Sequence, residues 1–220
     1  MKKGILILVM LISVFAKAQE GPTVVVFNSS SEKKEPEYWK KYNLVKFSIF
    51  EAFAGDFSFY YERVLNENFS AEIGFGPTLS NYASMLWNDN FTINDDNYEP
   101  LMGGSFAIGG RYYPYHAADE FYFAPEFKYK YYHNNLTYMN MLGQEEVMEE
   151  SWQVAMGRIT FGYCYFFDDN IFIDGSAGFG IGKVKMVSLD YDATTGAPYA
   201  KEDDILAPRF QVGLKVGVAF

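Results

Sequence analysis

The stretch Pro208–Phe220, PRFQVGLKVGVAF, alternates large apolar residues with small or polar ones along its whole length. Because successive side chains of a β-strand point to opposite faces, this period of two predicts one strand with two unlike faces. The small or polar face holds Arg209, Gln211, Gly213, Lys215, Gly217 and Ala219. The apolar face holds Phe210, Val212, Leu214, Val216, Val218 and Phe220.

The same alternation recurs upstream and predicts eight strands in all. The connections at 65–68, 114–120 and 168–170 are short, and those at 81–100, 134–150 and 188–207 are long and polar. This order places short turns at one end of an antiparallel sheet and long loops at the other; the short first connection, 54–56, is the exception. The predicted strands are Leu44–Phe53, Phe57–Val64, Phe69–Ser80, Leu101–Tyr113, Phe121–His133, Ser151–Phe167, Ile171–Val187 and Pro208–Phe220.

Composition indicates a membrane-spanning sheet. The chain has 49% hydrophobic residues, 21 Phe and 18 Tyr, yet its mean hydropathy is only -0.12. Alternating strands average to near neutral in this way, and transmembrane barrels carry aromatic girdles at the two membrane surfaces. An open sheet edge is not tolerated in hydrocarbon, so the last strand must pair with the first. We therefore predict an all-β fold: an eight-stranded antiparallel transmembrane up-and-down β-barrel.

The N-terminus predicts export. Lys2 and Lys3 precede a short apolar run and the small-residue site Ala16-Lys17-Ala18, which is the pattern of a cleaved signal peptide. We expect residues 1–18 to be this signal peptide, 19–43 a periplasmic N-terminal segment and 44–220 the barrel. Cleavage leaves 15 basic against 28 acidic residues, a formal charge of -13, so nucleic acid is not an expected partner. The single Cys164 excludes an internal disulfide.

Charged residues gather on the face predicted to line the interior. Eight strands enclose a space that side chains just fill, and buried charges of both signs must pair there. We expect these pairs to plug the interior; a gated path for ions or small solutes along the same residues is the alternative. The predicted network comprises Lys46, Glu62, Glu72, Arg111, Glu126, Lys128, Lys130, Arg158, Asp174 and Lys215.

One predicted strand changes its pattern midway. In Ser151–Phe167 the later apolar residues, from Ile159 to Phe167, lie on one face, whereas Trp152, Val154 and Met156 have the opposite parity. We interpret this inversion near Gly157 as a bulge or as the crossing of a membrane boundary.

The residues predict no catalytic, cofactor or metal site. His116 and His133 lack metal-ligand spacing, and no nucleophile, base and acid are grouped. Acidic side chains are frequent in the long connections, where oxygen ligands next to anionic lipopolysaccharide favour weak binding of divalent cations such as Ca²⁺ or Mg²⁺. These residues are Asp89, Asp95, Asp96, Glu99, Glu145, Glu146, Glu149, Glu150, Asp190, Asp192, Glu202, Asp203 and Asp204.

Taken with the signal peptide, the Leu65-Asn66-Glu67-Asn68 hairpin turn after Tyr61-Glu62-Arg63, and the terminal Phe220, residues 44–220 resemble the small outer-membrane β-barrel domains of the OmpA or OmpX type, in particular an uncharacterised, Bacteroidota-type family. The resemblance implies a location in the bacterial cell outer membrane. It also implies contact with outer-membrane lipid and lipopolysaccharide. The residues from Phe210 to Phe220 are similar to the signal that the barrel-assembly machinery reads.

The expected function is non-enzymatic, with a structural or surface-interaction role. A narrow, porin-like channel is the first alternative. The second alternative is either a lipid-modifying outer-membrane enzyme or a soluble lipocalin-like binder. The soluble alternative requires the apolar faces of the strands to point inward, so the direction of the Phe and Tyr side chains separates it from a membrane barrel.

Overall fold

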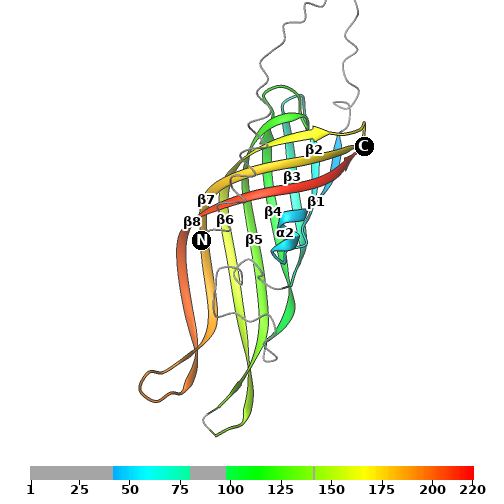
Figure 1. Cartoon of the computed structure of the whole chain (residues 1–220). Helices are drawn as coiled ribbons and strands as arrows, with labels where there is room; N and C mark the ends of the chain where they lie inside the picture. The colour runs from blue at the N-terminus through cyan, green and yellow to red at the C-terminus, as the bar shows by residue number, and fades with distance from the viewer. Residues whose placement is uncertain (1–41, 80–97, 141) are drawn as a thin grey trace, which may run out of the picture. The chain divides into compact units, whose positions relative to one another are not determined.

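The computed structural model describes residues 42–79, 98–140 and 142–220, and these form a closed barrel of eight antiparallel strands in chain order (Figure 1). The predicted fold is confirmed at this level. Residues 1–41, with the predicted signal peptide and most of the N-terminal segment, lie outside the described residues. The strands are β1 (Asn43–Ser48), β2 (Phe59–Val64), β3 (Phe69–Thr78), β4 (Tyr98–Tyr112), β5 (Glu120–Met139), β6 (Glu145–Phe166), β7 (Ile171–Tyr191) and β8 (Pro198–Ala219).

The barrel closes between its first and last strands. β1 pairs with β8 from Leu44 opposite Ala219 to Ser48 opposite Lys215. Asn43 and Phe220 exchange backbone hydrogen bonds of 3.1 and 2.9 Å at the end of this seam. Closure supplies both strands with backbone partners, which hydrocarbon cannot provide.

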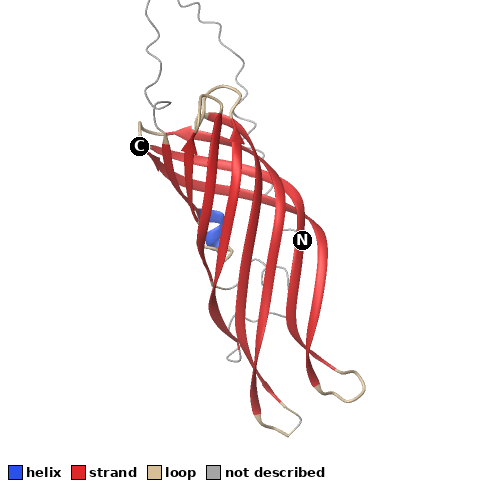
Figure 2. Ribbon diagram, turned by 180° about the vertical axis from the view of Figure 1, so that it is seen from behind, coloured by secondary structure: helices blue, strands red, loops and turns tan. Residues whose placement is uncertain are grey.

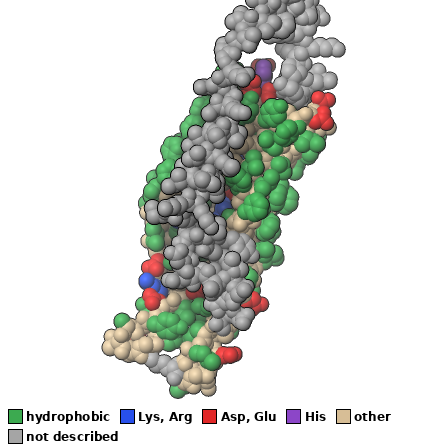
Figure 3. Space-filling model, viewed as in Figure 1, with side chains coloured by type: hydrophobic (Ala, Val, Ile, Leu, Met, Phe, Trp, Pro, Cys, Tyr) green, Lys and Arg blue, Asp and Glu red, His purple; other side chains and the backbone are tan. Residues whose placement is uncertain are grey.

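The outer face of the barrel is apolar. The residues predicted to face outward on β8 do so, with Phe210 85%, Val212 63% and Phe220 63% exposed. Aromatic rings on neighbouring strands also contact one another along the outer wall of the barrel. Figure 3 shows mostly hydrophobic side chains along this wall. Successive rings in this row lie 5.1 to 6.4 Å apart, in the order Phe69, Tyr112, Phe123, Phe161 and Phe179.

This apolar face has a clear boundary on the side of the long hairpins. The outward positions of β5 are Phe or Tyr as far as Tyr131, apart from Pro125, and then become His133 and Asn135. On β7 they are apolar from Ile171 to Ile181 and then become Lys183 and Lys185. A band of about 9 to 11 residues per strand is what a tilted strand needs to cross a bilayer. We call this band the lipid belt.

The first predicted strand is wrong in its second half. β1 ends at Ser48, and Ile49–Phe53 forms a short helix, α2, that lies beside β8 (Figures 1 and 2). A strand continued through Phe53 would point Glu51 outward into lipid, at a high cost in free energy. In α2 the Glu51 side chain is instead buried, while Phe53 is 78% exposed. β2 accordingly begins at Phe59, two residues later than predicted.

Two of the predicted long loops are largely strand. β5 continues to Met139 and β6 begins at Glu145, and β7 and β8 continue to a turn at 192–197, so each pair forms a long hairpin (Figure 2). Many of these residues are polar because the hairpins lie beyond the lipid belt, where neither face of a strand has to be apolar. Most of the predicted loop 81–100 lies outside the described residues.

β6 contains no bulge at Gly157. Its register with β5 is unbroken from Cys164 to Glu145, and its register with β7 is unbroken from Phe166 to Ser151. Trp152, Val154 and Met156 therefore keep the inward parity of Arg158. The inversion of the pattern agrees with the second interpretation, a membrane boundary, because the outward residue at this level is Gln153. An irregularity occurs instead in β4, between Leu101 and Gly104.

A small apolar core closes the barrel at the end that holds the short turns and Phe220. The turn after β4 folds inward, so that Ala117 and Ala118 are buried and Tyr113 is fully buried. Leu44 and Phe172, each 0% exposed, pack in the same cluster. No helix in the described part of the chain is long and apolar enough to span a membrane.

Candidate functional site

The interior of the barrel holds two groups of ionised side chains. The first, here the turn-side cluster, lies next to the apolar core and draws on six strands. Lys46 of β1 forms ion pairs with Glu62 of β2, with Glu72 of β3 at 2.7 Å and with Asp174 of β7 at 3.4 Å. The cluster comprises Lys46, Glu62, Glu72, Arg111, Asp174 and Lys215.

Arg111 and Lys215 complete the turn-side cluster. The Arg111 guanidinium spans two carboxylates, with one nitrogen 2.7 Å from Glu72 and the other 2.7 Å from Asp174. Lys215 reaches the second oxygen of Glu72 at 2.8 Å. Each carboxylate thus meets at least two cations, which is the arrangement that offsets the desolvation of buried charge.

Hydroxyl groups satisfy the remaining carboxylate oxygens of the turn-side cluster. Tyr113 donates to Glu62 at 2.7 Å, and Ser70 donates to the same oxygen. Tyr122 donates to Asp174 at 2.6 Å, and its ring lies 4.2 Å from the Arg111 guanidinium. A buried polar network with unsatisfied groups would be destabilising. These hydroxyl groups complete the hydrogen bonds of the carboxylates in the turn-side cluster, and a network whose carboxylates are held in this way is rigid.

The second group, here the hairpin-side cluster, lies nearer the long hairpins. Lys128 of β5 pairs with Glu51 of α2 and with Asp56, both at 2.8 Å. Lys130 also pairs with Asp56 at 2.8 Å. The cluster comprises Glu51, Asp56, Glu126, Lys128, Lys130 and Arg158, and its Arg158 forms an ion pair with Glu126.

Tyr60 joins the two clusters. Its hydroxyl donates to Glu51 at 2.6 Å and accepts from Lys128 at 2.7 Å. The ammonium group of Lys215 lies 3.5 Å from the centre of its ring, which is a cation–π contact. Tyr60 is 1% exposed, so the charged contacts continue without a gap from one cluster to the other.

All ten residues predicted for the interior network lie on the inner face, and each makes at least one of these ion pairs. The sequence missed Glu51 and Asp56, which the α2 segment folds inward. A signal for Glu51 exists in the sequence, because it shares the outward parity of Val45, Phe47 and Ile49 in the predicted first strand. A carboxylate on that face is incompatible with lipid, so the strand had to end before it.

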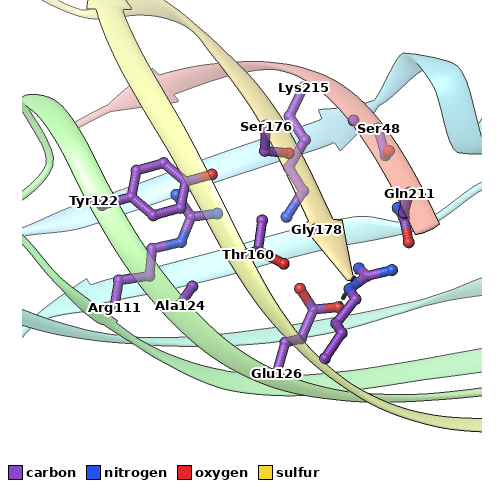
Figure 4. Close-up of a pocket in the computed structure, with 12 residues that line it drawn as sticks. Ser48, Arg111, Tyr122, Ala124, Glu126, Thr160, Ser176, Gly178, Gln211 and Lys215 are labelled. Carbon is purple, nitrogen blue, oxygen red and sulfur yellow. Dashed lines mark hydrogen bonds and ion pairs between the residues drawn. The ribbon is translucent and has the colours of Figure 1, made fainter. Parts of the chain in front are cut away.

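Little empty space remains between the clusters. A cavity of about 10 Å³ lies between Arg111, Glu126, Arg158 and Lys215 (Figure 4), close to the minimum volume that one water molecule needs. Four buried polar atoms without a hydrogen-bond partner belong to residues that line it: Ser48 Oγ, Arg111 Nε, Arg158 Nε and Thr160 Oγ1. The interior at this level therefore has room for a bound water and for little else.

The acidic side chains of the hairpins have local partners. Glu149 lies 3.0 Å from the Nδ1 atom of His133 and raises the pKa of that imidazole. A backbone N–H of Tyr191 and the side chain of Lys201 lower the pKa of Asp190. The described residues contain no group of three or more His, Cys, Asp or Glu that could hold a metal ion. Asp89, Asp95 and Asp96 lie outside those residues, and divalent cation binding stays a prediction.

No protein-family model matches the chain, and no curated protein matches its sequence. Two solved structures are similar. The N-terminal β-barrel domain of OprF from Pseudomonas aeruginosa is 15% identical, with a TM-score of 0.36 over 82% of this chain and 98% of that chain. A major outer membrane protein from Thermus thermophilus is 12% identical, with a TM-score of 0.38 over 82% and 98%. Since both TM-scores lie below 0.5, the class of this protein rests on its own strand order and faces.

A closed eight-stranded barrel with an apolar wall and a charged interior is an outer-membrane β-barrel. The wall excludes the soluble lipocalin-like alternative, because Phe127, Phe179 and Phe210 are 46, 51 and 85% exposed while Lys128 is 0% exposed. These values are the reverse of what bulk water would favour. The location predicted for the chain, the bacterial cell outer membrane, is the one where such a barrel is stable.

Proposed function

We propose that this protein is a non-enzymatic outer-membrane barrel with a plugged interior, whose role is structural or lies in surface interaction. The observation that carries the proposal is the pair of ion clusters joined through Tyr60. Together with the apolar core around Tyr113 and Phe172, they fill the cross-section at successive levels.

The two long hairpins support the surface role. Barrels of this class have short periplasmic turns and longer extracellular loops, so we assign the hairpins to the cell exterior. Their tips expose Leu142, Val147 and Tyr191, at 82, 64 and 52%. Exposed apolar side chains of this kind beyond the lipid belt suit contact with a partner or with lipopolysaccharide.

Conductance of the purified full chain in a planar bilayer tests the plug. We expect no resolvable openings, because an ion would have to displace several buried ion pairs to pass. Incorporation is verified on the same membranes by antibody binding to an epitope placed in the 192–197 turn. Steady openings from membranes that contain the protein would overturn the plug.

A narrow channel for ions or small solutes is the alternative. It would require a continuous wet path, and the small cavity between the clusters provides space for about one water. A variant that loosens the plug is a useful comparison: Glu51→Ala with Asp56→Ala removes both carboxylates that hold Lys128. If channel openings occur in this variant but not in the unaltered chain, the ion pairs of Glu51 and Asp56 with Lys128 are what close the interior to ions.

The finer family assignment, a Bacteroidota-type member of the OmpA or OmpX group, stays a prediction. The same holds for the barrel-assembly machinery as the partner that reads Phe210–Phe220, and for lipopolysaccharide as a contact. Absence of a lipid-modifying activity is part of the proposal, and mass analysis of lipid A with and without the gene tests it.

A further inference from the structure

A second cavity lies on the hairpin side of the plug. It measures about 140 Å³, is partly open, and lies among Ala54, Lys130, Tyr132, Trp152, Val154, Met156 and Arg209. The facing pairs Lys130–Val154 and Tyr132–Trp152 place it one to two pairs beyond Lys128 and Met156 in the direction of the hairpin tips. It is thus reached from the end of the barrel that holds the long hairpins.

Two buried donors of this cavity lack an acceptor. The Nε1 atom of Trp152 and the Nε atom of Arg209 have no hydrogen-bond partner, although both atoms are inaccessible to solvent. An unpaired buried donor is costly, and each one needs an explanation such as a missing ligand or water. Both donors belong to residues that line one cavity, so a small rotation of either side chain would bring its N–H to one acceptor bound there.

The charge of the interior points to an anion. The turn-side and hairpin-side clusters together hold six cations and six carboxylates, so they are formally neutral. Arg209 belongs to neither cluster, and none of the ion pairs within residues 42–79, 98–140 and 142–220 includes it. A half-buried guanidinium that lines a partly open cavity and has no carboxylate partner offers a binding point for an anion, and the planar fork of an arginine fits a carboxylate best.

The position of Arg209 is fixed by a small residue. Its side chain crosses Gly182 of β7, where an added Cβ would lie 2.9 Å from the Arg209 Cγ and 3.4 Å from the Met156 Cβ. The glycine thus lets the guanidinium of β8 approach the apolar residues of β6. The guanidinium of Arg209 therefore lies beside apolar side chains inside the barrel.

The rest of the cavity suits a compact apolar body. Val154, Met156 and Ala54 supply aliphatic surface, and Tyr132 and Trp152 supply aromatic rings. An apolar cavity of about 150 Å³ holds a molecule of the size of benzene. We propose that this cavity binds a small monocarboxylate with a ring-sized apolar body, whose carboxylate accepts hydrogen bonds from Arg209 and Trp152. The inference does not depend on the plug, since a conducting barrel with the same residues would bind the same anion.

Calorimetric titration of the full chain in detergent with benzoate tests the proposal. Saturable binding is expected, with benzyl alcohol and acetate each at least about tenfold weaker, because one lacks the charge and the other the ring. Arg209→Gln is expected to weaken benzoate binding by about tenfold or more, and Trp152→Phe by about two- to tenfold. Arg63→Gln is the matched control, since it removes an exposed guanidinium that contacts Asn43 at the opposite end.

Folding of each variant is checked by the heat-dependent shift in gel mobility that folded barrels show. If Arg209→Gln does not fold, Arg209→Lys keeps the charge without the planar fork and is expected to weaken binding severalfold. No saturable heat with benzoate up to about 10 mM, or equal affinities for the unaltered chain and the folded Arg209 variant, would overturn the proposal. Neither result bears on conductance, so the two proposals fail separately.

Discussion

Lys46 shows how much a single residue of the turn-side cluster contributes to stability. Its ammonium group is fully buried and faces three carboxylates, Glu62, Glu72 and Asp174. Lys46→Met keeps the volume but leaves three anions to Arg111 and Lys215 alone. We expect the free energy of unfolding to fall by about 3–5 kcal/mol, as when one partner of a buried pair is removed.

Urea unfolding in lipid vesicles measures the effect of Lys46→Met. The matched control is Lys183→Met, because Lys183 pairs with Asp204 at 2.9 Å where both side chains are about half exposed, and an exposed pair contributes at most about 1 kcal/mol. Equal midpoints for the two variants would contradict the importance of the turn-side cluster for stability.

His133 lies just beyond the lipid belt and gives the outer hairpin a dependence on pH. Its Nδ1 atom is 3.0 Å from Glu149 and its Nε2 atom is 3.0 Å from the carbonyl oxygen of Met102. Only the protonated ring donates from both nitrogens, so the hydrogen bond to Glu149 raises the pKa of His133 above its usual value of about 6.5.

The raised pKa means that the contribution of His133 to stability is fully present below about pH 6.5 and is lost as the pH rises through the folded value. A chemical-shift titration of the imidazole is expected to give a pKa above the usual one, and Glu149→Gln is expected to lower it. Glu145→Gln, four residues further towards the tip, is the control. An unchanged titration in Glu149→Gln would assign the shift to another cause.

At the scale of the elements, alternation predicts a strand wherever lipid touches one face and the interior the other. Leu214 and Val216 on β8 and Phe121 and Phe123 on β5 follow this rule, and the sequence places them correctly. The rule fails beyond the lipid belt. There a hairpin strand mixes polar and apolar residues on both faces, as at 134–139, where Asn, Thr, Leu, Tyr and Met show no alternation, and the sequence alone does not separate it from a loop.

The strand residues of the candidate site were predictable, whereas Glu51 of α2 and Asp56 of the following turn were not. Inward parity identifies Lys128 and Arg158 because a β-strand fixes side-chain direction. The direction of Glu51 and Asp56 depends on where the chain leaves β1, which long-range pairing with Lys128 decides. Arg209 was assigned to the small or polar face of its strand, but its lack of a carboxylate partner emerges only from the packed interior.

The inner face of β6 has a position where only glycine fits. A Cβ at Gly162 would overlap the ring of Tyr122, which donates to Asp174. We expect Gly162→Ala to cost about 1–3 kcal/mol through displacement of this ring. Gly157→Ala on the same strand is the control, because nothing lies within 4 Å of its added Cβ. Urea unfolding compares the two, and an equal effect of both variants would show that Tyr122 moves freely.

For the molecule as a whole, the class of protein depends on whether the outer wall of the barrel faces lipid or water. Ala177 lies near the middle of the lipid belt, opposite Phe161 of β6 and Val212 of β8. Ala177→Arg adds a charge there without removing a large side chain. A barrel that spans a bilayer is expected to lose about 2–4 kcal/mol of folding free energy, because a cation at the midplane leaves water for hydrocarbon.

Thr137→Arg on β5, beyond the belt, isolates the role of lipid, since an arginine near or outside the interface costs only about 0–1 kcal/mol. Unfolding of both variants is measured in vesicles and again in a detergent micelle, whose looser interior lets the arginine reach water. A large loss for Ala177→Arg in vesicles alone, with little change for Thr137→Arg, is the expected pattern. If both variants match the unaltered chain in vesicles, the wall does not face lipid, and the outer-membrane class itself would have to be abandoned.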